Sequence, residues 1–250
     1  MPVTVTMTGS AFLSEVLGTA VLIALGAGLN ANMKLARTKG RGDSWLLTSL
    51  GWGMAVFTAV YVAFDSGAHL NPAVTLGKLI SGQPFHETAD LVIEASFAAA
   101  GAYASAQLLG AFLGACVAWL AYKQHFDLPA DDGVKLGIFA TGPAIRSAPW
   151  NLITEAIGTF VLVFWVLIND ATPSELGPLA VALVVVAIGA GLGGPTGYAI
   201  NPARDLGPRL AHAVLPIPGK GASEWGYAWV PVVGPLAGAS LAALAGMAIL

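Results

Sequence analysis

The sequence predicts an all-α integral membrane protein, in which six transmembrane helices and two re-entrant half-helices form an inverted 3+3 repeat. Three observations predict this fold class. Hydrophobic residues make up 56% of the 250 residues and charged residues only 10%, whereas soluble domains carry roughly 25% charged residues. Six apolar stretches approach or exceed the about 20 residues that a helix needs to cross a bilayer. Two shorter apolar segments, one in each half of the chain, begin with the same tripeptide, Asn-Pro-Ala.

Polar breaks separate the six predicted spans. The spans are residues 11–30, 45–64, a stretch within 91–122, 150–168, 176–192 and 227–250. No basic segment precedes the first span, and its apolar run continues past any plausible cleavage point, so we interpret it as a transmembrane helix and not as a removable signal. The stretch 91–122 holds 32 residues, more than one upright helix needs at about 1.5 Å per residue. Its first part either extends the third helix or forms a loop.

Residues 70–80 and 199–214 are apolar but too short to cross a membrane. Non-helical backbone at membrane depth is tolerated only where it is buried in protein or lines a water-filled cavity. The two halves also echo each other elsewhere, because "SEVLGT" at 14–19 matches "TEAIGT" at 154–159. Each half holds three spans, an odd number, so the second half must enter the membrane upside down. We therefore expect a single domain over residues 1–250, with a first repeat at 11–122 and a second at 150–250.

Each Asn-Pro-Ala tripeptide predicts the start of a short helix. Pro is favoured at the first helical position, Asn is a favoured N-cap, and Ala is small enough for two such ends to meet closely. In an inverted repeat, two helix N-termini would face each other near the midplane, each with a partial charge of roughly +0.5. Such a place accepts neutral solutes with oxygen acceptors, repels cations and orients water so that proton hopping is hindered. The predicted site residues are Asn71, Pro72, Ala73, Asn201, Pro202 and Ala203.

With the motifs "SGAHLNPAVT" and "TGYAINPARDLGPR", the chain resembles the major intrinsic protein (aquaporin) family from Glu15 to the sixth span. The resemblance implies a right-handed six-helix bundle in the cell membrane, assembled as a homotetramer with one pore per subunit. Asp205 and Arg209 after the second tripeptide, and the pair Pro235 and Leu236 in "GPLAG", resemble the aquaglyceroporin branch. That branch implies a passive channel for glycerol, water and other small uncharged polyols that excludes ions and protons. A water-selective aquaporin is the alternative.

The resemblance also implies a selectivity filter at Trp52, Gly189, Tyr198 and Arg204. A guanidinium group stays charged and offers several donors in a rigid fork, while the two aromatic rings would give apolar walls opposite it. A glycerol molecule could then lay its carbon edge on the rings and its hydroxyl edge on the donors, and Gly189 would leave room for it. The spacing from Trp52 to Asn71 is one residue shorter than the family pattern, so Gly51 is an alternative at that position.

Two acidic residues fall within predicted membrane helices. Glu15 and Glu155 could belong to a proton relay, or each could brace a re-entrant loop by accepting backbone N–H bonds. Their matching places in the two repeats, together with the resemblance, favour bracing. His69, just before the first tripeptide, is expected to brace the pore wall in a similar way.

The remaining chemistry is sparse. His86, His125 and His212 show no ligand pattern, and a single cysteine, Cys116, allows no internal disulfide. We expect no metal, no cofactor and no enzyme activity, and a net charge of −3 gives no reason to expect a nucleic-acid partner. The expected partners are glycerol and water as permeants, membrane lipid and further copies of the chain. Alternatives from other classes are an ion- or proton-coupled transporter that uses the two glutamates, and an intramembrane enzyme.

The loop after the first span is basic, with Lys34, Arg37, Lys39 and Arg41. The positive-inside rule would place this loop in the cytoplasm. The resemblance implies the reverse, with both termini cytoplasmic, and the two indications disagree.

Overall fold

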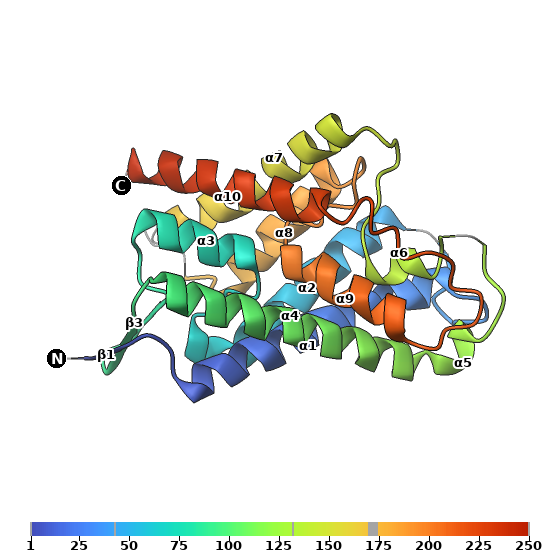
Figure 1. Ribbon diagram of the computed structural model, residues 1–250, viewed down its shortest axis with the longest axis horizontal. Helices are drawn as coiled ribbons and strands as arrows, with labels where there is room; N and C mark the ends of the chain where they lie inside the picture. The colour runs from blue at the N-terminus through green and yellow to red at the C-terminus, as the bar shows by residue number, and fades with distance from the viewer. Residues whose placement is uncertain (1, 43, 132, 170–174, 250) are drawn as a thin grey trace.

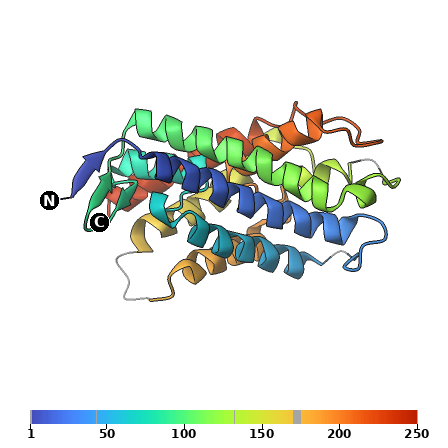
Figure 2. The ribbon, with the colours of Figure 1, turned by 90° about the horizontal axis from the view of Figure 1, so that it is seen from below.

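The computed structural model describes residues 2–42, 44–131, 133–169 and 175–249. Six longer helices lie side by side along the long axis of the molecule (Figures 1 and 2). They are α1 (Gly9–Lys34), α2 (Trp45–Val62), α4 (Phe97–Ala121), α7 (Ala148–Ile168), α8 (Pro178–Leu192) and α10 (Val230–Met247). Each of the six predicted spans overlaps one of these helices. Residue 250, at the end of the last predicted span, and the polar break at 170–174 lie outside the described residues.

Length separates α8 from the other five bundle helices. Within the described parts of the chain, five helices have at least 18 residues and are apolar enough to cross a membrane. The helix α8 is apolar as well but has only 15 residues, about 22 Å at the usual helical rise. It packs against α2 and α7.

Two shorter helices, α3 (Pro72–Ser81) and α9 (Pro202–Val214), begin at the two Asn-Pro-Ala tripeptides. In Figure 1, α3 lies toward the end of the molecule that holds both chain termini, and α9 lies toward the opposite end. An even number of crossings returns both termini to the same end. The N-termini of the two half-helices meet between these ends, where hydrogen bonds link them directly.

The closest helix pairs in the two halves pack through matching glycines. A Cβ atom on Gly110 of α4 would lie 2.3 Å from the carbonyl oxygen of Val16 on α1, and one on Gly114 would lie 2.3 Å from that of Ala20. In the second half, a Cβ atom on Gly238 of α10 would lie 2.2 Å from the carbonyl oxygen of an alanine on α7. Small residues at such positions let membrane helices approach closely without a hydrophobic driving force.

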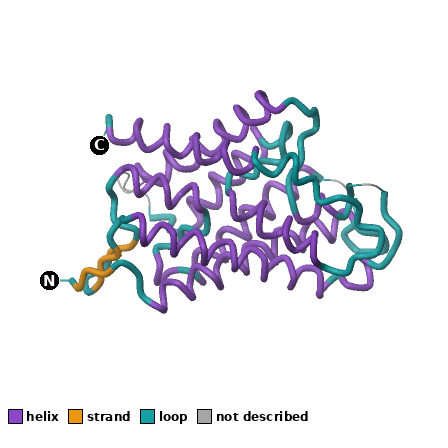
Figure 3. The backbone as a smooth tube through the Cα atoms, in the orientation of Figure 1, coloured by secondary structure: helices purple, strands orange, loops and turns teal. Residues whose placement is uncertain are grey.

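A small sheet lies beside the N-terminus at one end of the bundle, as Figure 3 shows. Its strands are β1 (Val3–Val5), β2 (His86–Glu87) and β3 (Leu91–Ile93), in the order β1-β3-β2, with β1 parallel and β2 antiparallel to β3. The first residues of the stretch 91–122 therefore form a strand, and the third membrane helix begins only at Phe97. The sequence left this point open.

The connections contain three further short elements, η1 (Phe64–Ser66), α5 (Lys123–Phe126) and α6 (Leu136–Phe139). One hydrophobic core runs through the bundle. A second, smaller cluster, which includes Phe85, Ile93 and Tyr103, lies beneath the sheet.

Candidate functional site

The two asparagines cap the half-helices as the sequence predicts. The side-chain oxygen of Asn71 accepts from the N–H of Ala73 at 2.9 Å. The side-chain oxygen of Asn201 accepts from the N–H groups of Ala203 and Arg204 at 3.0 and 3.2 Å. Each cap satisfies N–H groups that have no partner inside the helix.

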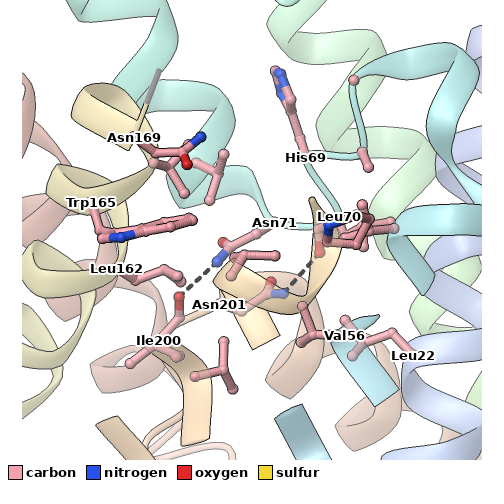
Figure 4. Close-up of a pocket in the computed structure, with 18 of the residues that line it drawn as sticks. Leu22, Val56, His69, Leu70, Asn71, Leu162, Trp165, Asn169, Ile200 and Asn201 are labelled. Atoms are coloured by element: carbon pink, nitrogen blue, oxygen red, sulfur yellow. Dashed lines mark hydrogen bonds between the residues drawn. The ribbon is translucent and has the colours of Figure 1, made fainter. Parts of the chain in front are cut away.

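The amide nitrogens of the same two asparagines tie the half-helices together. Nδ2 of Asn71 donates to the carbonyl oxygen of Ile200, and Nδ2 of Asn201 donates to that of Leu70, both at 2.8 Å (Figure 4). An amide NH₂ group has two hydrogens, so each asparagine keeps a second donor. The pair is therefore fixed by one N–H and retains the other for a molecule beside it.

Glu15 and Glu155 hold the two loops that precede the half-helices. Glu15 accepts from the N–H groups of His69 and Leu70 at 2.9 and 2.8 Å. Glu155 accepts from two consecutive N–H groups as well, those of Ala199 and Ile200, at 3.0 and 2.8 Å. Both glutamates are buried, so each carboxylate is committed to its loop by equivalent contacts.

Both loops contain backbone in the left-handed region. Ala68 and Leu70 have φ angles of 51° and 56°, and Tyr198 and Ile200 have φ angles of 38° and 44°. A residue with a side chain rarely adopts this region and does so at a cost of about 1–2 kcal/mol. The bonds to the glutamates lie next to these residues and compensate for that cost.

Neutral side chains add to the first loop. Nε2 of His69 lies 3.0 Å from the carbonyl oxygen of Phe85, and its Nδ1 lies 2.9 Å from the hydroxyl of Thr75. Because the carbonyl can only accept, Nε2 carries the proton. Gln107 donates to both Thr75 and Glu15, at 3.1 and 2.7 Å. His69 thus has protein partners on both ring nitrogens, which agrees with the expected bracing.

A cavity of about 480 Å³ runs past the two asparagines, and both of them line it. The surrounding helices contribute mainly apolar side chains, such as Val56 of α2, Leu162 of α7 and Val181 of α8. Polar groups enter this apolar lining from the two loops. Among the described residues, no backbone N–H group donates to the carbonyl oxygens of residues 67–69, so the backbone leaves these oxygens available as acceptors.

Three of the four residues predicted for the filter lie at one end of this cavity. Trp52, Tyr198 and Arg204 line it. The guanidinium carbon of Arg204 lies 4.0 Å from the centre of the Trp52 ring, and its Nη1 donates to the carbonyl oxygen of Phe139 at 3.0 Å. The two side chains are therefore stacked. This differs from the sequence-based expectation, which puts the Trp52 ring on the wall opposite the guanidinium. A cation above an indole face is attracted by the ring quadrupole, which explains the difference.

At Gly189 the structure also differs from the expectation that this glycine leaves room for glycerol. A Cβ atom on Gly189 would lie 2.8 Å from Cζ of Tyr198, so the tyrosine ring fills the space beside this glycine. Gly189 is not among the residues that line the cavity. Gly51 faces Leu29, because a Cβ atom there would lie 2.4 Å from a methyl carbon of that leucine. The geometry thus places Trp52, and not Gly51, at the cavity.

Asp205 and Arg209 form a buried ion pair, with Nε of Arg209 2.8 Å from Oδ1 of Asp205. Asp205 also accepts from the backbone N–H and the hydroxyl of Thr141, both at 2.8 Å. Arg209 donates to the carbonyl oxygens of Ser223 and Glu224 at 2.8 and 3.2 Å. The pair therefore fastens two loops to α9 and does not line the cavity.

Pro235 and Leu236 lie on α10, outside the lining of the cavity. Nothing in their surroundings relates them directly to a permeant. Their assignment as markers of the glycerol branch stays a prediction, as does the assignment of the filter.

Sequence reasoning missed several supporting residues. Asn30 accepts from Nε1 of Trp52 at 3.4 Å and donates to the carbonyl oxygen of Ile138 at 3.3 Å. Trp45 donates to the carbonyl oxygen of Gly189 at 2.9 Å, and its ring meets that of Tyr198 edge to face. The lone Asn at the end of the first predicted span was a signal for the contacts of Asn30. Nothing in the sequence indicated the contacts of Trp45.

Metal-binding clusters are absent from the described ranges, where no group of three or more His, Cys, Asp or Glu side chains could hold a metal ion.

At the mouth of the cavity nearest the termini, His86 lies beside Lys78. Burial, and then the positive charge of Lys78, lower the pKa of His86 below its usual range, so this histidine is neutral at neutral pH.

Comparison with known proteins places this geometry in a family. Residues 3–245 match the model of the major intrinsic protein family. The chain is 49% identical to glycerol uptake facilitator protein 3 of Lactiplantibacillus plantarum, over 93% of each chain. It is 48% identical to the probable glycerol uptake facilitator protein of Thermotoga maritima, over 94% of this chain and 97% of that one.

Among solved structures, the X-ray structure of the aquaglyceroporin from Plasmodium falciparum superposes with a TM-score of 0.79 at 30% identity and covers 96% of each chain. This likeness confirms the predicted fold class.

Proposed function

The chain belongs to the major intrinsic protein family, and from this premise we propose that it is a passive channel for glycerol and water in the cell membrane. Other small uncharged polyols pass by the same route, and ions and protons are excluded. The observation that carries the proposal is the pair of asparagines, tied tip to tip inside one cavity with apolar walls. The relatives at 49% and 48% identity carry names as glycerol uptake facilitators.

The cavity suits a molecule with one carbon edge and one hydroxyl edge. Valine and leucine side chains line its walls, while the loop carbonyls at 67–69 accept and the second N–H of each asparagine donates. A polyol can therefore exchange its hydrogen bonds with water for bonds with the protein, while its carbon edge contacts apolar side chains. This exchange lowers the cost of desolvation for a neutral solute.

Cations lack such compensation at the centre. The N-termini of α3 and α9 meet there, and each carries a partial positive charge of roughly +0.5. Arg204 adds a full positive charge at one end of the cavity. A water molecule at the centre donates away from the two asparagines, and this orientation hinders proton hopping along a water wire.

Two alternatives fit less well. A proton-coupled transporter would need Glu15 and Glu155 as exchangeable carriers, but both carboxylates are engaged by backbone N–H groups of the loops. A water-selective aquaporin would need a filter too narrow for glycerol. The names of the relatives and the presence of Asp205, Pro235 and Leu236 favour the glycerol branch over it. Catalysis forms no part of the proposal.

We also propose that the chain assembles as a homotetramer in lipid, with one lumen in each subunit. The complete cavity within a single chain supports one lumen per subunit. The proposed architecture is one channel domain over residues 1–250 with repeats at 11–122 and 150–250. The similar contacts of Glu15 and Glu155 support this division.

The test is stopped-flow light scattering on proteoliposomes that contain the purified chain. We expect glycerol and water to equilibrate faster than in empty vesicles, with a rate proportional to the gradient and insensitive to uncouplers. Fast water flux with glycerol flux no faster than in empty vesicles would support the water-selective alternative. Concentrative or uncoupler-sensitive uptake would support the transporter.

A further inference from the structure

A second tryptophan lines the cavity, away from the Trp52–Arg204 stack. Trp165 lies one turn before Asn169 near the end of α7, and both residues line the cavity with Leu162. Its side chain points from α7 toward Asn71 (Figure 4). The same half of the cavity ends at His86 of β2. Trp52 and Trp165 therefore lie in opposite halves of the lumen.

The usual role of tryptophan in a membrane protein is to anchor a helix at the lipid interface. On α7, Trp150 fits that role. It is 69% exposed, and the exposed residues Ile153 and Ile157 follow it on the same face of the helix. Trp165 is half-buried and lines the cavity. Anchoring therefore does not explain its position.

The surroundings of Trp165 combine an apolar surface with hydrogen-bond acceptors. Val60 of α2 and Val181 of α8 line this half of the cavity. Residues 67–69 also line the cavity, and their carbonyl oxygens accept no hydrogen bond from the backbone N–H groups of the described residues. An indole ring adds a large rigid face at this level. Carbon edges of a polyol contact such a face, while its hydroxyls donate to the carbonyls.

We propose that Trp165 is a second specificity-determining residue, which limits the size of the polyols that cross this half of the lumen. The inference rests on the proposed function, because it assumes that polyols are the permeants. The bulk of the ring slows the passage of polyols larger than glycerol, and its face guides the carbon edge of those that pass. Selection by size thus occurs on both sides of the asparagine pair.

The experiment compares Trp165→Ala with Trp150→Ala, the same change at an exposed position of the same helix. Each variant is reconstituted into proteoliposomes, and stopped-flow light scattering measures the permeability of water, glycerol and the five-carbon polyol ribitol. We expect Trp165→Ala to raise the ratio of ribitol to glycerol permeability at least about threefold, which corresponds to a barrier change of about 0.7 kcal/mol. Trp150→Ala should leave the ratio unchanged.

Water permeability shows whether a variant forms an open channel. If Trp165→Ala does not reconstitute, Trp165→Leu serves in its place, since leucine keeps an apolar side chain but removes the ring. An unchanged ribitol-to-glycerol ratio in a Trp165 variant with normal water flux would overturn the inference and leave the proposed function intact. Glycerol flux of the unmodified chain no faster than in empty vesicles would instead be a failure of the proposed function.

Discussion

The two loops that lead into the half-helices share a backbone and differ in their chemistry. In both, an Asn caps the helix, a buried Glu accepts two consecutive N–H groups, and non-glycine residues adopt positive φ angles. The side chains then diverge at positions that lie 130 residues apart in the sequence. The pairs are Val74 and Arg204, Thr75 and Asp205, and Leu79 and Arg209.

This difference separates two tasks. The shared features shape the backbone and bring the two asparagines together, so both halves need them. In these three pairs only the α9 member is charged: Arg204 reaches the cavity, and Asp205 with Arg209 fastens the neighbouring loops. On α3 a neutral network of His69, Thr75 and Gln107 replaces them. The backbone arrangement is therefore the same in both halves, whereas the charges at these three positions occur in the second half alone.

The largest effect should come from breaking the buried pair on α9. Asp205→Thr gives α9 the residue of α3 but leaves Arg209 as an uncompensated buried charge, which costs about 3–5 kcal/mol. The double variant Asp205→Thr/Arg209→Leu, which matches α3 at both positions, should be less destabilised than the single one. Thermal unfolding in detergent, followed by tryptophan fluorescence, measures both. A double variant less stable than Asp205→Thr would show that the loop contacts of Arg209 matter more than the pair.

Next in size is the comparison of the two glutamates. Glu15 also accepts from Ser66 and Gln107, at 2.6 and 2.7 Å, besides its two backbone donors. Each Glu15 oxygen accepts two hydrogen bonds, so in Glu15→Gln two donors would face an NH₂ group, against one in Glu155→Gln. A buried donor without a partner costs about 1–3 kcal/mol. We expect Glu15→Gln to lower the melting temperature more than Glu155→Gln does. Equal losses would mean that the backbone donors alone carry the stabilisation.

A change in selectivity tests the charge itself. Arg204→Val gives α9 the residue that α3 has at the equivalent position, and it removes the guanidinium from the stack on Trp52. We expect proton leak to rise at least about tenfold, a barrier change of about 1.4 kcal/mol, with glycerol flux retained. A pH-sensitive dye inside proteoliposomes measures the leak. If the leak stays at the level of the unmodified channel, Arg204 does not guard the lumen, and the helix ends alone exclude protons.

The smallest expected effect is on the pH dependence of stability, through His86 at the mouth of the cavity near α3. The pKa of His86 is lowered from its ordinary value of 6.5, first by burial and then by Lys78. As the pH falls below 6.5, the unfolded chain takes up this proton before the folded chain does, so folding stability decreases. Melting temperatures at pH 7.5 and 5.5 should therefore differ more for the unmodified chain than for His86→Asn. The same difference in both would assign the pH dependence to other groups.

The sequence by itself determined the features that depend on local composition and on internal repetition. Six apolar stretches fixed the number and order of the membrane helices, and two Asn-Pro-Ala tripeptides fixed where the half-helices begin. The paired glutamates were found because the two halves echo each other. These properties follow from the chemistry of short segments, since capping, helix initiation and membrane burial act over a few residues.

Only the tertiary structure decided which groups meet across the bundle. Asn71 donates to a carbonyl 129 residues away, Arg204 stacks on Trp52, and Tyr198 fills the space beside Gly189. The tertiary structure also decided that Trp165 lines the cavity and that residues 91–93 form a strand. The spacing of residues along one helix does not specify its neighbours, because several apolar faces can pack against one another. Contacts between distant segments therefore settle the lining of the lumen.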